Sequence, residues 1–354
     1  MVRSAGPASA QPPTQGPAVP TQVCITIDTE FSIGGAFGDP VNRRPLGPEN
    51  VTCPVGSDEH GLRFLLETFA AHGVSATFFV ETTQSTYFGD DPMRRLVERI
   101  LEARQDVQLH VHPCWRTFRD PQWGASVSAD SPPNDNCDQL AETELSELID
   151  EGLATLRRYG VAAPVAMRTG NLRASRGVYR AMAACGLRLA SNVGVGLIRP
   201  ADDSLVLRGG RHWIEGVLEV PVLTYTQLEV GARSYDRLLT TTATSAAEMQ
   251  ALLWQARACD VPTVVILTHP FEFIKGERAN PASHRVNRVN QSRLQQTCQF
   301  IADNPSDFEA VSFASAAPGW LEGAPVADPD LKAPLLSVLA RMAENKANDL
   351  IPAI

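Results

Sequence analysis

Along the chain, short runs of β-branched and aromatic residues alternate with longer runs whose apolar residues recur every third or fourth position. The stretch 61–81 contains one complete example. From Leu62 to Phe69 the apolar residues fall at i, i+3, i+4 and i+7, which predicts an amphipathic helix that ends at Gly73. The run VSATFFVE follows directly and predicts a buried strand.

This alternation repeats through most of the sequence. Helices are predicted near 61–73, 90–104, 145–156, 174–186, 246–259 and 290–302, and strands at 23–28, 74–81, 106–112, 165–168, 187–192, 217–222, 263–269 and 309–313. Strands that alternate with helices are typical of parallel sheets with crossover helices. About eight strands favour an α/β fold with a distorted (β/α) barrel of seven to eight parallel strands, and an open doubly wound sheet is the alternative.

The ends of the chain differ from this pattern. Residues 1–20 are rich in Pro, Ala, Gly and Gln, which predicts a disordered segment. We expect one barrel domain over 21–320. The remaining residues, 321–354, are expected to form a helical tail, which is a candidate oligomer contact.

Charge and cysteine content narrow the possible partners and location. The formal net charge is -9, and Lys and Arg do not cluster, so we expect no nucleic-acid partner. The seven cysteines lack any C-x-x-C pair, which is typical of neither a disulfide framework nor a zinc ribbon. We recognise no signal peptide and no run of about 18 apolar residues, so we expect no membrane span and a cytoplasmic protein.

Four predicted strands end in polar residues. These are Asp28 and Glu30, then His110 and His112, then Arg168 and Asn171, and finally His269. In parallel α/β folds the active site lies at the carboxyl ends of the strands, so we expect these side chains to meet.

Two of these strand ends indicate a metal. Asp28 and Glu30 lie two residues apart on an extended segment, and such a close pair of carboxylates is costly without a cation or a shared proton. His110 and His112 have the same spacing, and two imidazoles with a carboxylate form a good site for a divalent metal. Each residue also has an ordinary structural interpretation, since a strand end can simply emerge into water.

The other strand ends supply candidate catalytic and binding groups. At Arg168 a guanidinium can orient a carboxylate or bind a substrate oxygen. His269 is a candidate general acid. Asn171 and Trp115, which follow the third and second of these strand ends, are candidate substrate-binding residues.

In this order the motifs resemble those of the polysaccharide deacetylases, the NodB-like or carbohydrate esterase family 4 group. The resemblance covers roughly residues 23–315. GLRFLLETFAAHGVSATFFVE is its most specific part, and ITIDTE, LHVHP, MRTGNLRAS, LEVPV and ILTHP are similar to the family's successive motifs.

The resemblance implies a distorted (β/α) barrel and a divalent metal, usually zinc or cobalt. It implies Asp28 as the catalytic base, Glu30 and His110 as metal ligands, Arg168 as the residue that orients the base, and His269 as the acid.

Two features depart from the family pattern. The family commonly spaces its two histidines four apart, whereas Cys114 stands four after His110; we prefer His112, and a thiolate is an alternative ligand. The family's double aspartate is also interrupted by Thr29, so the roles of Asp28 and Glu30 are interchangeable at this stage.

The implied activity is hydrolysis of the acyl group, most simply acetyl, from an N-acylated sugar or a glycan precursor. Two alternatives stay open. One is a related barrel hydrolase that acts on a non-sugar C–N bond, and the other is a sugar-binding relative without turnover.

Overall fold

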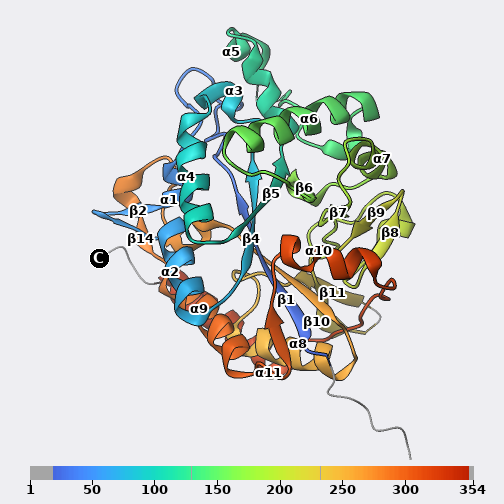
Figure 1. Ribbon diagram of the computed structural model, residues 1–354. Coiled ribbons are helices and arrows are strands. Elements are labelled where there is room, and N and C mark those ends of the chain that lie inside the picture. Colours follow the sequence, from blue (N-terminus) through green and yellow to red (C-terminus); the bar gives the residue numbers. More distant parts are fainter. Residues whose placement is uncertain (1–18, 129, 232, 351–354) are drawn as a thin grey trace, which may run out of the picture.

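The computed structural model describes residues 19–128, 130–231 and 233–350. Residues 1–18 of the expected disordered segment lie outside the described residues. Figure 1 shows helices arranged around the outside of one curled sheet.

The central sheet is built from parallel strands. Its order is β12-β1-β4-β5-β6-β7-β9, with β8 antiparallel at the edge and β15 beside the start of β1. The strands are β1 (Thr21–Thr29), β4 (Ala76–Glu81), β5 (Asp106–Val111), β6 (Ala166–Thr169), β7 (Leu189–Ala190), β8 (His212–Ile214), β9 (Val217–Glu219), β12 (Thr263–Thr268) and β15 (Phe308–Ala310). Strands β1, β4 and β12 are almost wholly buried, which explains their continuous apolar runs.

The sheet curls back on itself through the segment that follows β9. The backbone N–H of Leu223 donates to the carbonyl of Val265 in β12 at 3.0 Å, and that of Leu267 donates to Leu239 at 3.0 Å. These two hydrogen bonds link the two edges of the sheet through irregular backbone instead of through a regular strand. The distorted (β/α) barrel is therefore confirmed.

The helices cover the curled sheet with apolar faces. In α4, for example, Met93, Leu96, Val97 and Ile100 are buried. Gly73 ends α2 at φ +64°, as the sequence predicted. The helices are α1 (Glu49–Thr52), α2 (Leu62–His72), α3 (Ser85–Phe88), α4 (Asp91–Glu102), α5 (Trp123–Ser126), α6 (Glu142–Arg158), α7 (Arg176–Ala184), α8 (Ala246–Ala258), α9 (Arg288–Asp303), α10 (Phe313–Glu322) and α11 (Leu335–Leu350).

Some elements differ from the expected ones. The last strand ends at Ala310 because Ser312 and Ser315 form a capping box that starts α10 at Phe313. The sequence pattern did not predict the antiparallel hairpin β10 (Thr224–Val230) and β11 (Arg233–Leu238). Short hairpins also pair β2 (Pro54–Val55) with β3 (Asp58–Glu59) and β13 (Ile274–Lys275) with β14 (Arg285–Val286).

Helix α11 packs against the barrel. Arg341 is buried and pairs with the buried Glu248 of α8 at 2.9 Å, while Arg293 of α9 pairs with Glu344. Its other face exposes Leu336, and an oligomer contact there stays a prediction.

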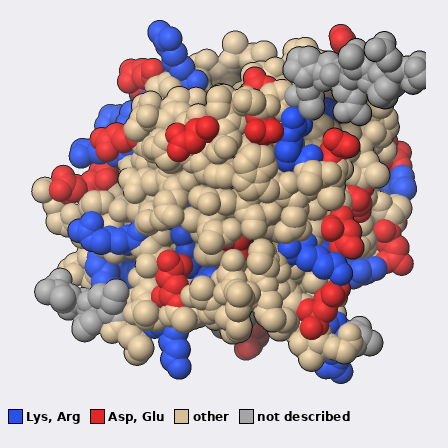
Figure 2. Space-filling view, turned by 90° about the horizontal axis from the view of Figure 1, so that it is seen from below, with Lys and Arg blue, Asp and Glu red and all other residues tan. Residues whose placement is uncertain are grey.

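The surface agrees with the mixed charge of the sequence. On the face drawn in Figure 2, Lys and Arg side chains are interspersed with Asp and Glu. Among the described helices, none combines the length and the apolar character that a membrane crossing requires.

Candidate metal centre and active site

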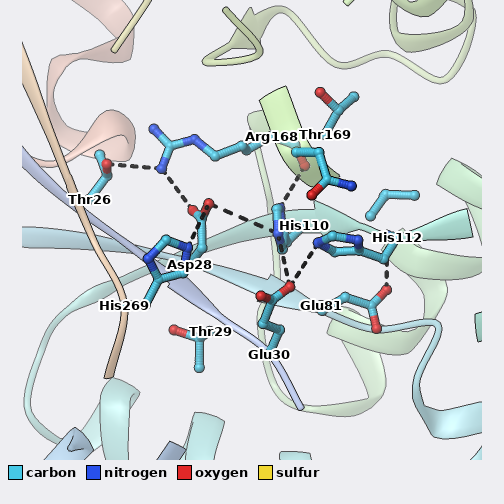
Figure 3. A network of polar contacts seen from close by, with 12 residues as sticks. Thr26, Asp28, Thr29, Glu30, Glu81, His110, His112, Arg168, Thr169 and His269 are labelled. Carbon is cyan, nitrogen blue, oxygen red and sulfur yellow. Dashed lines mark hydrogen bonds and ion pairs between the residues drawn. The ribbon is translucent and has the colours of Figure 1, made fainter. Parts of the chain in front are cut away.

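The four polar strand ends meet at one edge of the sheet. Strands β12, β1, β4, β5 and β6 are neighbours in that order, so Asp28, His110, Arg168 and His269 are brought together from segments far apart in sequence. Figure 3 shows the resulting cluster, with His269 at one end and His112 at the other.

Glu30 and the two histidines form a compact set of metal-ligand atoms. The Nε2 atom of His112 lies 2.8 Å from Oε2 of Glu30, and that of His110 lies 3.5 Å from the same oxygen. One donor atom from each residue falls within 4.8 Å of the others. One carboxylate and two imidazoles are a donor set typical of zinc and related divalent ions.

The remaining ring nitrogens are held by hydrogen bonds. Nδ1 of His110 donates to the backbone carbonyl of Arg168 at 2.9 Å, which leaves the Nε2 lone pair directed at the centre. Nδ1 of His112 lies 2.8 Å from Oδ2 of Asp135. Such partners fix the orientation of a histidine and increase its basicity as a ligand.

Glu30 and His112 each favour the charged form of the other. Burial opposes ionisation of Glu30, but the His112 charge and hydrogen bonds from both histidines hold its pKa well below the usual range. Burial likewise disfavours the His112 cation, but Glu30 and Asp135 raise the pKa of His112 well above its usual value. His112 is therefore held between two carboxylates.

Asp28 lies beside this set and is anchored by a buried arginine. Nη1 of Arg168 donates to Oδ1 of Asp28 at 2.7 Å and to the hydroxyl of Thr26 at 2.9 Å. The other guanidinium nitrogens donate to the backbone carbonyl and the hydroxyl of Ser191. The guanidinium also packs 4.3 Å from the ring centre of Phe79. Arg168 is thus fixed, and it leaves Oδ2 of Asp28 directed towards the cluster.

His269 lies on the other side of Asp28. Its Nε2 is 3.9 Å from Oδ2 of Asp28, and its Nδ1 is 2.9 Å from Oε1 of Glu272. Oε2 of Glu272 accepts hydrogen bonds from the hydroxyls of Thr241 and Thr268. Burial lowers the pKa of His269, but the hydrogen bond and charge of Glu272, with the charges of Asp28 and Glu30, raise it overall.

The two candidate substrate-binding residues are placed differently. Asn171 is exposed, and its amide donates to Oδ2 of Asp135 at 3.0 Å, so it lies close to His112. Trp115 is only 2% exposed and packs against Phe88 and Phe118. The ring of Trp115 belongs to the 3-10 helix Pro113–Arg119 and lies in the core, and its role in substrate binding stays a prediction.

Cys114 does not join the set that contains Glu30. Its thiol groups instead with Asp135 and His112, and its backbone N–H donates to Oδ1 of Asp135 at 3.3 Å. Burial and the neighbouring Asp135 charge raise the pKa of this thiol well above its usual value. The geometry therefore favours His112 over Cys114 as the partner of His110.

The sequence did not point to three residues that support the site. Asp135 comes from a polar loop without periodicity. Glu81 ends β4, next to His110 in the sheet, and accepts the backbone N–H groups of Thr83 and Gln84. Of the three, only Glu272 could have been suggested from the sequence, since it follows His269 by three residues, just beyond a strand end.

Comparison with known proteins gave matches among solved structures only. No family model matches, and no curated protein matches. A putative polysaccharide deacetylase from Mycobacterium smegmatis is 14% identical, with a TM-score of 0.47 over 92% of this chain and 99% of that one. A family 4 carbohydrate esterase from Streptomyces lividans, in complex with acetate, is 14% identical, with a TM-score of 0.42 over 88% of this chain and 100% of that one. A CE4 family pseudoenzyme from Bacillus anthracis is 11% identical, with a TM-score of 0.42 over 84% of this chain and 66% of that one. These likenesses concern the fold.

Proposed function

We propose that this chain is a metal-dependent hydrolase that removes an acyl group from the nitrogen of an N-acylated sugar or glycan precursor. The observation that carries the proposal is the row of groups at the strand ends. Three potential metal-ligand residues, an arginine-anchored carboxylate and a histidine lie next to one another, an arrangement that suits metal-assisted amide hydrolysis.

The metal would be held by Glu30, His110 and His112. The donor set fits a zinc-like ion, because both histidines direct Nε2 at Glu30 while their Nδ1 atoms are already occupied. When bound, a divalent ion in such a site polarises the acyl carbonyl and makes water more acidic.

Asp28 is the better candidate for the general base, and Glu30 for the ligand. Glu30 contacts both histidines directly, whereas Oδ2 of Asp28 is 4.0 Å from His110 and 3.9 Å from His269. Because Arg168 holds Oδ1, Oδ2 is left to accept a proton from the attacking water.

We assign to His269 the role of the general acid, because it lies on the other side of Asp28 from the proposed metal ligands. Water adds its oxygen to the acyl carbon, the C–N bond breaks, and one proton passes to Asp28 while His269 donates one to the leaving nitrogen. The raised pKa of His269 favours the protonated form, which donates this proton. The products are a carboxylic acid and a free amino sugar.

The first test combines metal content with product release. We expect one equivalent of zinc or cobalt per chain, release of acid from N-acylated hexosamines, and loss of activity on chelation. His112→Ala should lose the ion, whereas Cys114→Ala, the matched control two residues away, should keep it. Asp28→Asn should keep the ion and lose turnover.

Two other outcomes would favour the alternative functions. Sugar binding without metal or turnover would favour a binding protein. Turnover of cyclic amides, with none of N-acylated sugars, would favour a different hydrolase.

A further inference from the structure

A surface hollow lies next to the metal site, on the side of His112. It has a volume of about 620 Å³, and its lining includes Asp135, whose carboxylate contacts the His112 ring. Ile33 and Cys114 also line it, and they lie three and two residues from Glu30 and His112. Because Nε2 of His112 faces Glu30 and Nδ1 faces Asp135, the hollow lies beyond the His112 ring as seen from Glu30.

The hollow lies away from the candidate acid. In Figure 3, His269 and His112 occupy opposite ends of the cluster, with Asp28, His110 and Glu30 between them. The amine leaves at His269, and in an amide the rest of the acyl chain lies on the other side of the carbonyl carbon. A chain that extends away from His269 is directed past His112, towards the hollow.

The lining is suited to an apolar, uncharged group. One part of the wall consists of Ile33, Phe37, Pro132 and Pro133. The carboxamides of Asn134, Asn136 and Gln139 complete it, and none of the described residues that line it is Lys or Arg. A carboxylate-bearing or phosphorylated group would find no cation there and would meet Asp135 instead.

The size of the hollow exceeds what an acetyl group requires. A methyl group is comparable to a water molecule, which occupies about 30 Å³ in the liquid. Hollows of about 300–1,000 Å³ accommodate whole small molecules. The space beside His112 thus has room for a chain of several carbons or a ring.

We propose that this hollow is an acyl-binding pocket and that the substrate carries a medium-length or aromatic neutral acyl group on its amide nitrogen, larger than acetyl. This inference rests on the proposed function. Each methylene that the wall buries should raise kcat/KM roughly fourfold.

The test is an acyl series on one hexosamine: acetyl, butyryl, hexanoyl and benzoyl. The metal-loaded full chain should hydrolyse the hexanoyl compound at least about tenfold more efficiently than the acetyl compound. Gln139→Trp places bulk in the hollow from an exposed position, and it should reduce the hexanoyl-to-acetyl ratio of kcat/KM to about one. Ile33→Trp fills the hollow from another part of the lining and should act in the same way, whereas Gln139→Ala should keep the preference.

The outcomes separate the two proposals. If the wild-type chain hydrolyses the acetyl compound as well as or better than the longer ones, the acyl pocket is wrong and the proposed function stands. If no member of the series is hydrolysed, the proposed function fails and the acyl pocket fails with it. A hexanoyl preference that both tryptophan variants leave intact would place the acyl group elsewhere and overturn the assignment of the hollow.

Discussion

The imidazole of His112 occupies the space that a side chain at Gly170 would fill. A Cβ atom added to Gly170 would lie 2.4 Å from both Cε1 and Nδ1 of His112. Gly170 immediately follows β6, the strand beside β5, so the glycine allows a ring two residues after His110 to turn towards Glu30. The close spacing of the two histidines thus depends on a residue from the next strand.

Gly170→Ala should therefore weaken metal binding. The added methyl must displace the His112 ring, and we expect the metal dissociation constant to rise about 10–100-fold, as when a partner of a ligand is lost. Competition with a chromophoric chelator measures this constant. Gly319→Ala is the matched control, because a Cβ there meets nothing within 4 Å and the residue lies in helix α10. Equal metal affinity in the two variants would show that the glycine does not position His112.

Asp135 is the second residue expected to position His112. Asp135→Asn removes the negative charge and one of two oxygens that accept from the His112 ring and the Cys114 backbone. We expect about 10–100-fold weaker metal binding and, at saturating metal, a recovered kcat. Asp130→Asn, an exposed change in the same loop, should alter neither quantity. An unchanged metal affinity in Asp135→Asn would argue that the carboxylate only holds the loop.

Glu272→Gln should change the pH dependence of turnover. The hydrogen bond and charge of Glu272 raise the pKa of His269 against the effect of burial, so the substitution should lower this pKa. A general acid works only while protonated, so activity is lost as pH rises through the pKa. The alkaline limb of the kcat profile should therefore move to lower pH in Glu272→Gln.

The matched control is Glu277→Gln, an exposed glutamate in the loop that follows. Its alkaline limb should coincide with that of the wild-type chain. A Glu272→Gln limb that does not move, or moves to higher pH, would contradict the role of His269 as the acid.

The strand-end residues were predictable because their positions follow from the sheet itself. A run such as VVILT fixes where β12 ends, and the side-by-side order of parallel strands then brings His269 to Asp28. Asp135 was not predictable, since its loop has no periodicity and its place is fixed by tertiary contacts with His112. The burial of Trp115 was not predictable either, because nearness to His112 in sequence does not show which way a 3-10 helix turns its ring. The acyl hollow combines residues near 33, 114 and 132–139, and no local pattern joins these segments.

The buried pair of Arg168 and Asp28 offers a test of stability as well as of catalysis. Arg168→Met removes the guanidinium, which is fully buried, and leaves Asp28 without its charged partner. Breaking a buried ion pair in this way costs about 3–5 kcal/mol of unfolding free energy, because the remaining charge is uncompensated. Urea unfolding of the metal-free chain measures this cost without interference from the ion.

The double variant Arg168→Met with Asp28→Asn isolates the interaction between the two residues. Since the carboxylate is then neutral, much of the lost stability should return, giving a coupling free energy of about 1–3 kcal/mol in the double-mutant cycle. Turnover should not return, because the proposed base is absent. Strictly additive losses would mean that Arg168 stabilises the fold through its contacts with Thr26, Ser191 and Phe79 and not through Asp28, and the anchoring of the base would then need another explanation.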